Sequence, residues 1–170
     1  QQFDGLGLTG AYVGQKLTKI PSRIESFERF AQRFPAGRVL VPNNDGLRQY
    51  GRNPYRLYDA ENGRPFLYFD DLPSDIPPMA RVVIAQGYES RAYALTKIAQ
   101  VGVLKDGDLE ISWTAGQNSA LDNGLIAKGR DVGNIVVQRV NDAGERGDIV
   151  YDVTFAFVYH AFIENGEIVQ

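Results

Sequence analysis

The sequence predicts an α+β fold that is mainly β, with about eight short, mostly antiparallel strands and one amphipathic helix. Three observations support this prediction. Short apolar segments alternate with turn-forming residues along most of the chain. One segment, residues 22–34, repeats apolar side chains at helical spacing. A proline-rich connector at 70–79 excludes both a helix and a central strand there. With 170 residues, 44% of them hydrophobic, the chain can bury a core without disulfides, and we predict a single domain.

The first elements expected are a strand, a helix and a second strand. Weak alternation at 11–20 predicts the first strand. Ser22 and Glu25 have the spacing of a capping box, so we predict a helix from Ser22 to Phe34. Its apolar stripe consists of Ile24, Phe27, Phe30, Ala31 and Phe34. A proline and a glycine follow the stripe and end the helix, and Arg38–Val41 is predicted as a short buried strand.

A long polar segment, residues 42–65, comes next and is rich in turn-forming residues. Loops of this length are usually functional or packed by their own side chains. Three tyrosines in the segment, Tyr50, Tyr55 and Tyr58, favour self-packing. A short strand at Phe66–Phe69 is expected before the proline-rich connector.

The second half of the chain carries the strongest strand patterns. Apolar runs predict strands at Arg81–Ala85 and Ser90–Ala94, followed by a short helical turn at Leu95–Gln100. The Asp106-Gly107 pair is a hairpin signal before the strand Asp108–Thr114. On that strand one face is expected to carry Leu109, Ile111 and Trp113.

The last predicted elements form a hairpin around residues 141–148. Its strands are Asn134–Val140 and a long one at Ile149–Phe162. Alternation puts apolar residues on both faces of the long strand, which predicts a central strand covered on both sides. Between the strands ending at Thr114 and beginning at Asn134 lies a glycine-rich block, Gly116–Gly133, which we expect to be a rigid loop.

Composition excludes several classes of function. The formal net charge is −3 and the charges are interspersed, which argues against nucleic acid as the main partner. No apolar run is long enough to span a bilayer, so we predict no transmembrane segment. The chain has no cysteine and one histidine, His160, which removes thiolate nucleophiles, disulfides and multi-histidine metal sites. We predict no cofactor, no metal and no catalytic residue.

Two groups of residues could form a catalytic or a calcium site, and each also has a structural interpretation. Ser119 and His160 with an acid (Asp122, Asp131 or Asp152) would form a hydrolase triad, but the sequence around Ser119 lacks the G-x-S-x-G turn. A lone histidine on an apolar strand is more often structural. Two acidic clusters could bind calcium, although their spacing favours solvated turns. These clusters are Asp70, Asp71 and Asp75, and Asp142, Glu145 and Asp148.

Two segments supply the candidate ligand-binding residues. In the first, Arg52, Asn53 and Tyr55 combine a guanidinium, an amide and an aromatic ring, which could recognise an anion or a sugar or could lock the loop. The second is the Gly116–Gly133 block. Its candidates are Gln117, Asn118, Ser119, Asp122, Arg130 and Asp131. As structure, Arg130 would pair with Asp122 or Asp131 and the amides would satisfy backbone groups.

Several strings together resemble one bacterial family. They are LTKIPSRIESFERFAQRFPAGRVLVPN, QYGRNPYRLYD, PPMARVVIA, GQNSALDNGLIAKGRDVGNIVVQ and YDVTFAFVYHAF. In this order, from Gln1 to about Phe162, they resemble the C-terminal half of the family called domain of unknown function 3179. Full-length members carry an upstream half with a Cys-Pro-Leu-Cys motif and a His-Glu pair, which this sequence does not contain.

The resemblance implies that this chain corresponds to the C-terminal half of a longer protein. It implies an extracytoplasmic location in bacteria, periplasmic or in the cell envelope. Any metal or thiol chemistry of the family would belong to the upstream half. We therefore predict a non-catalytic binding or assembly domain whose partner is another protein or that upstream half. The alternative is a hydrolase-like or cofactor-assisted enzyme domain that the upstream half completes.

Overall fold

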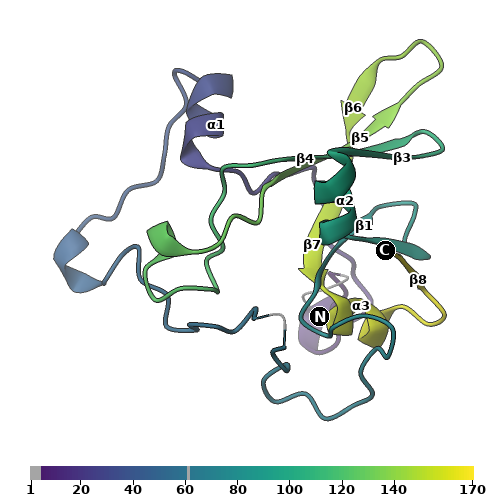
Figure 1. Cartoon of the computed structure of the whole chain (residues 1–170), viewed down its shortest axis with the longest axis horizontal. Helices are drawn as coiled ribbons and strands as arrows, with labels where there is room; N and C mark the ends of the chain where they lie inside the picture. Colours follow the sequence, from purple (N-terminus) through teal and green to yellow (C-terminus); the bar gives the residue numbers. More distant parts are fainter. Residues whose placement is uncertain (1–4, 61) are drawn as a thin grey trace.

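Two four-stranded sheets form the frame of the molecule (Figure 1). A computed structural model describes residues 5–60 and 62–170. The first sheet has the order β7-β1-β2-β8, with bounds Tyr151–Phe155, Arg81–Ala85, Arg91–Ala94 and Glu167–Val169. Its neighbours are antiparallel except for the parallel pair β2 and β8. The eight mostly antiparallel strands of the described residues confirm the predicted α+β, mainly-β class.

The second sheet has the order β3-β4-β5-β6 and is antiparallel throughout. Its strands are β3 at Val103–Asp106, β4 at Leu109–Thr114, β5 at Asn134–Val140 and β6 at Arg146–Asp148. The register pairs Asp106 with Leu109, which confirms the hairpin predicted at Asp106-Gly107. Leu109 and Ile111 are buried and Trp113 packs against the same cluster, so the predicted apolar face of β4 is confirmed.

The core lies on both faces of β1. Val83 and Ala85 point toward the second sheet, where they join Ile98 of α2 (Leu95–Val101). Val82 and Ile84 point the other way, where they pack with Ala156 and Tyr159 of α3 (Ala156–Phe162). A strand buried on both faces needs a continuous apolar run, which the sequence RVVIA supplies. The central strand is therefore β1.

Helix α2 follows β2 directly and confirms the helical turn predicted there. It ends at Gly102, whose φ of 72° is in the left-handed region and whose N–H donates to the carbonyl of Ile98. None of the helices within 5–60 and 62–170 has the length and apolar character needed to cross a membrane.

The long strand predicted at Ile149–Phe162 is wrong. Strand β7 ends at Phe155, and helix α3 begins at Ala156. Ala156 and Tyr159 are three residues apart and both are buried, so their spacing suits a helix as well as the alternating pattern suits a strand. The predicted pairing of this segment with Asn134–Val140 is also wrong, because β5 pairs with β6 and β7 pairs with β1.

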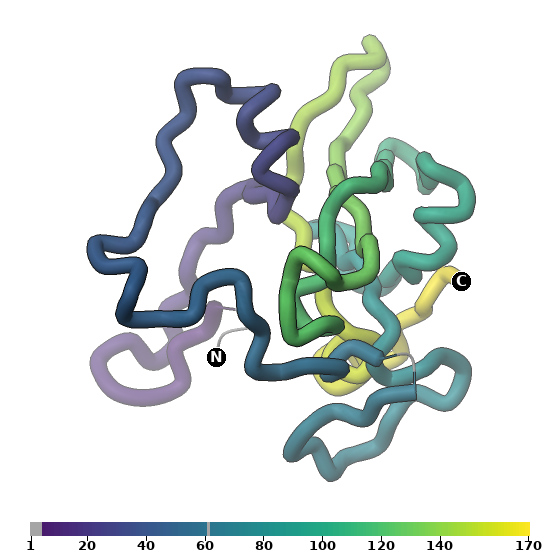
Figure 2. The backbone as a smooth tube through the Cα atoms, turned by 60° about the vertical axis from the view of Figure 1, so that its left-hand side comes forward, coloured from purple at the N-terminus to yellow at the C-terminus, as the bar shows by residue number. Residues whose placement is uncertain are grey.

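We call residues 5–60 and 62–69 the N-terminal arm, and its stretch at about 27–47 extends away from the sheets (Figures 1 and 2). The strands predicted at 11–20, Arg38–Val41 and Phe66–Phe69 are wrong, because the arm carries turns, an isolated bridge and short 3₁₀ helices at Gly10–Tyr12 and Asp45–Leu47. Leu40 is 100% exposed and Phe69 is 89% exposed. Apolar runs here lack a sheet to join, so their strand propensity is not used.

Helix α1, the α-helix found in the described part of the arm, spans Phe27–Arg33 and not Ser22 to Phe34. Its N-cap is Ser26, whose hydroxyl accepts a hydrogen bond from the N–H of Arg29. The Ser22 and Glu25 box does not form, because Glu25 is engaged by Arg33 through hydrogen bonds of 2.6–3.2 Å. The arm is fastened to the sheets beside α1 by the N–H of Ser26, which donates to Asn134 Oδ1 at 2.7 Å.

This difference in cap position is testable by two serine substitutions. Ser26→Ala removes the capping acceptor and is expected to lower the local opening free energy of α1 by about 1 kcal/mol, seen as faster hydrogen exchange of its amides. Ser22→Ala is the matched control and should change that free energy by less than about 0.5 kcal/mol. Larger acceleration from Ser22→Ala than from Ser26→Ala would restore the capping box.

Candidate functional site

The Gly116–Gly133 block folds into a closed loop. Its base is a short antiparallel bridge between Asn118 and Asp131, in which the N–H of Ser119 donates to the carbonyl of Arg130 at 2.8 Å. The Asp131 carboxylate accepts three backbone N–H groups, from Gly116, Gln117 and Gly133, at 2.8–3.1 Å. Burial works against ionisation, but these donors outweigh it and lower the pKa of Asp131. Asp131 therefore holds the loop in shape.

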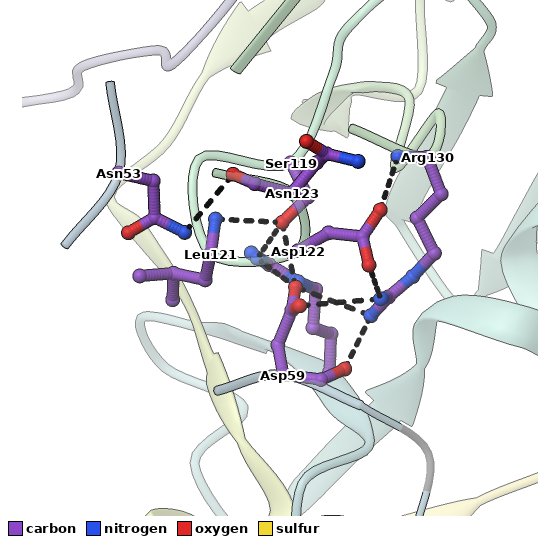
Figure 3. Close-up of polar contacts among 8 residues, drawn as sticks. Asn53, Asp59, Ser119, Leu121, Asp122, Asn123 and Arg130 are labelled. Carbon is purple, nitrogen blue, oxygen red and sulfur yellow. Dashed lines mark hydrogen bonds and ion pairs between the residues drawn. The ribbon is translucent and has the colours of Figure 1, made fainter. Parts of the chain in front are cut away.

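The second candidate segment docks onto this loop (Figure 3). The N–H of Asn53 donates to the carbonyl of Gly124 at 3.1 Å, and its side-chain amide donates to the carbonyl of Asn123 at 3.3 Å. Further along, the N–H of Leu57 donates to the carbonyl of Asp122 at 2.8 Å. The two segments singled out from the sequence thus form one unit, and Asn53 is buried within it.

Asp59 lies at the centre of this unit and is fully buried. Its Oδ2 accepts hydrogen bonds from the Ser119 hydroxyl at 2.6 Å and from Arg81 Nη2 at 2.8 Å. Its Oδ1 accepts from Arg130 Nη1 at 3.1 Å, and its main-chain oxygen accepts from Arg130 Nη2 at 2.5 Å. Figure 3 shows Ser119 and Arg130 beside Asp59. We call Asp59, Arg81, Ser119, Asp122 and Arg130 the Asp59 cluster.

The charges of the Asp59 cluster are balanced within the cluster. Burial by itself would raise the pKa of Asp59, but the hydrogen bonds from Ser119 and Arg81 and the charge of Arg130 outweigh it, so the pKa is lowered. Arg130 also contacts Asp122, at 3.4 Å from its guanidinium and 2.7 Å from its backbone N–H. Two guanidinium groups face two carboxylates, and the cluster has no net formal charge.

The remaining candidates lie outside the cluster. Arg52, Tyr55 and Asn118 are exposed. Gln117 is half-buried next to the cluster, and its Oε1 has no hydrogen-bond partner among the residues described.

Asp59 and Arg81 were not predicted as site residues from the sequence. Asp59 stands in a turn-rich segment and Arg81 at the start of an apolar strand, and neither position carries a local signal of pairing.

The hydrolase triad is not assembled. Ser119 is buried, and in the described part of the chain its hydroxyl contacts Asp59, Arg81 and the N–H of Leu121. His160 lies exposed at the end of α3 and is not among those partners. A general base must reach the proton that it abstracts, and here a carboxylate takes that position.

The acidic clusters weighed as calcium sites are not brought together either. Over the described residues, no group of three or more histidine, aspartate or glutamate side chains is arranged to hold a metal ion. Asp148 instead accepts hydrogen bonds from Arg23 and Gln138, and Glu145 accepts one from Asn141.

Two cavities flank the Asp59 cluster. One, of about 370 Å³, is bounded by Asp59, Arg130 and an apolar wall that includes Met79 and Trp113. The other, of about 200 Å³, is bounded by Gln117 and by apolar side chains such as Ile135. Three residues line both cavities: Arg81, Leu95 and Val132. Arg81 therefore lies between the two cavities. Its guanidinium donates to Asp59, and its Cζ lies 5.6 Å from the centroid of the Phe155 ring.

The chain was compared with protein families, curated proteins and solved structures. The model of a family described as "Protein of unknown function (DUF3179)" matches residues 1–166, essentially the whole chain. No curated protein matches the sequence, and no solved structure does.

Proposed function

Since this chain belongs to the DUF3179 family, which is described only as being of unknown function, we propose from its structure that it is a non-catalytic assembly domain. The observation that carries the proposal is the composition of the N-terminal arm's surface. Of the described residues in the arm, Asn53 and Asp59 are buried, and both are polar. Among the residues that the structure describes, all but four of the large exposed apolar side chains lie in the arm, the exceptions being Val101, Val103, Leu125 and Phe162.

Such an arm is unusual for a domain that works alone. Exposed apolar side chains occur singly on most proteins, but their concentration on one segment marks an interaction surface. Exposure is high in the middle of the arm, with Leu40 at 100% and Leu47 at 78%, and at its end, with Phe69 at 89%. A partner with an apolar face would remove these side chains from water, each contributing about 1.5–3 kcal/mol if fully buried.

The arm is nevertheless held in a defined shape. Lys19 pairs with Asp152 at 2.8 Å, and Arg23 reaches Asp148 with two contacts of 2.5 and 2.6 Å. Asn53 and Asp59 anchor its far end in the Gly116–Gly133 block. Polar contacts thus fix the arm on both sides of the exposed stretch that carries Leu40 and Leu47, which limits the conformations that this stretch must lose on binding.

We assign the partner as a folded protein with an apolar face, the upstream half of a longer family-type protein in the first instance. The location that accompanies this proposal is the bacterial periplasm or cell envelope. Fractionation of source cells tests the location, because the protein should be recovered with the envelope or periplasmic fraction. Recovery with the cytoplasmic fraction alone would contradict it.

The assembly proposal predicts the behaviour of a double variant, Leu40→Asp with Phe69→Asp. Protein purified natively from the source should run as a complex larger than the chain alone, and the double variant should abolish that complex. Because both side chains are already exposed, the free energy of unfolding of the isolated chain should change by less than about 0.5 kcal/mol. The measurements are native size-exclusion chromatography with mass spectrometry, and urea denaturation.

A matched control is Arg48→Asp, an exposed charge change in the same part of the arm. It should leave the complex intact. A wild-type protein that purifies as a lone monomer, or a double variant that keeps its complex, would contradict the proposal.

A further inference from the structure

Two buried polar atoms without partners line the same cavity. Across the described residues, the unpaired buried side-chain atoms are Arg81 Nε and Gln117 Oε1. Both residues bound the cavity of about 200 Å³ beside the Asp59 cluster. One atom is a hydrogen-bond donor and the other is an acceptor. Buried polar groups are nearly always satisfied, so such a pair in one cavity indicates that a molecule occupies it.

Both groups are held in place by the fold. Arg81 donates through Nη2 to Asp59 and to Ser119 and lies over the Phe155 ring, and its buried Nε–H takes no part in these contacts. The backbone of Gln117 is fixed on both sides, since its N–H donates to Asp131 and its carbonyl accepts from Val132 at 2.8 Å. The Arg81 side chain and the backbone that carries Gln117 are therefore preformed.

Charge decides between ligand classes. Arg81 and Arg130 are already balanced by Asp59 and Asp122, so an incoming carboxylate would add an uncompensated negative charge next to a buried carboxylate. A neutral group adds none. The rest of the wall combines apolar side chains, such as Leu95, Ile135 and Val153, with Ser22, Tyr151 and the carboxylate of Asp152, which also disfavours an anion. Apolar walls with a few placed polar groups are typical of small-molecule sites.

We propose that this cavity binds a neutral carboxamide group. Its carbonyl oxygen accepts from Arg81 Nε–H and its N–H donates to Gln117 Oε1. A half-turn of the Gln117 amide would present its NH₂ instead, but Arg81 can only donate, so the ligand atom that faces Arg81 is an acceptor. The carboxamide can come from a primary amide or from a peptide bond. This site is separate from the apolar surface of the arm.

The test is a titration of the full chain with three small probes of similar size, followed by NMR. Acetamide represents a primary amide, N-methylacetamide a peptide bond, and acetate an anion. We expect at least one amide to saturate with a dissociation constant on the order of 1–10 mM, as suits so small a ligand, and to shift the Arg81 Nε–H resonance. Which amide binds more tightly distinguishes the two sources.

The matching variant is Gln117→Met, which removes the acceptor and keeps a similar length. It should weaken amide binding about fivefold to tenfold, the effect of one hydrogen bond. Gln86→Met is the control, since Gln86 is exposed and lines a different cavity. Acetate binding as tightly as the amides would overturn the neutral-ligand assignment. Absence of saturable binding, with a crystal structure showing only water between Arg81 and Gln117, would overturn the site.

Discussion

Asp59→Asn is expected to lower the free energy of unfolding by about 3–5 kcal/mol. The substitution keeps the shape of the side chain but removes the charge that two guanidinium groups share. Arg81 and Arg130 would then face a neutral amide in a buried position, and the Ser119 hydroxyl would lose its strongest acceptor. Urea denaturation followed by the fluorescence of Trp113, the one tryptophan in the chain, measures the change.

The control is Asp152→Asn, which breaks the exposed pair with Lys19. The side chain of Asp152 is 46% exposed, and such pairs contribute about 1 kcal/mol at most. Similar small losses in both variants would mean that the Asp59 cluster contributes no more than a surface ion pair.

The stability that Asp59 contributes also has a predictable pH dependence. Its pKa is lowered in the folded state from the usual value of 3.8, so its contribution is fully present above that value. The contribution is lost as the pH falls through the lower folded pKa. Denaturation midpoints of the wild type should therefore drop on acidification more steeply than those of Asp59→Asn, and the two curves should converge at the most acidic pH values.

Gly133→Ala is expected to have the second-largest effect and to lower the free energy of unfolding by about 2–5 kcal/mol. Gly133 has a φ of 74°, where an alanine costs about 1–2 kcal/mol. A Cβ at this position would also overlap the Trp113 ring at Nε1 and Cε2. That ring cannot withdraw freely, because its Nε1–H donates to the carbonyl of Val132 at 3.0 Å and its body packs on the core.

Gly144→Ala separates the two causes. Gly144 also has a positive φ, 81°, but a Cβ there meets nothing within 4 Å. It should therefore cost only the backbone term, about 1–2 kcal/mol. The same denaturation experiment reports both, and the emission maximum of Trp113 should move in Gly133→Ala alone. If both variants lose the same free energy of unfolding and the Trp113 emission does not move, the overlap with Trp113 does not contribute to the loss.

The sequence predicted the elements of the core well because each carries its own local signal. The run Arg81–Ala85, the turn at Asp106-Gly107 and the apolar face of Leu109 and Ile111 were all found in the structure. The helix α3 was missed because residues 155–162 are apolar at every position except His160, which fits a strand buried on both faces as well as a helix, and packing against β1 decided between them. The strands expected in the arm were missed because strand formation needs a neighbouring strand, which local pattern does not reveal.

The candidate site was also predicted only in part. The Gly116–Gly133 block and the segment with Asn53 were recognised as separate candidates, and the pairing of Arg130 with Asp122 was among the alternatives. Their union was not predictable, since it depends on Asp59, which lies 60 residues from Ser119 and 71 residues from Arg130 along the chain. Contacts at such separations are set by the topology of the whole fold and leave no trace in residue spacing.

The sequence separation between Asp59 and its partners also sets how long the arm waits for its anchor during synthesis. Chains are synthesised from the N-terminus at about 5–20 residues per second, so a gap of 71 residues means that Asp59 precedes Arg130 by roughly 4–14 seconds. The apolar core residues, from Ile76 onward, are also made after the arm. During that interval the arm has neither its anchor nor a core to lie against. Within residues 5–170 the exposed apolar side chains of the arm are therefore made before the core to which the arm is anchored, and until that core forms the arm depends on a chaperone or on an early partner.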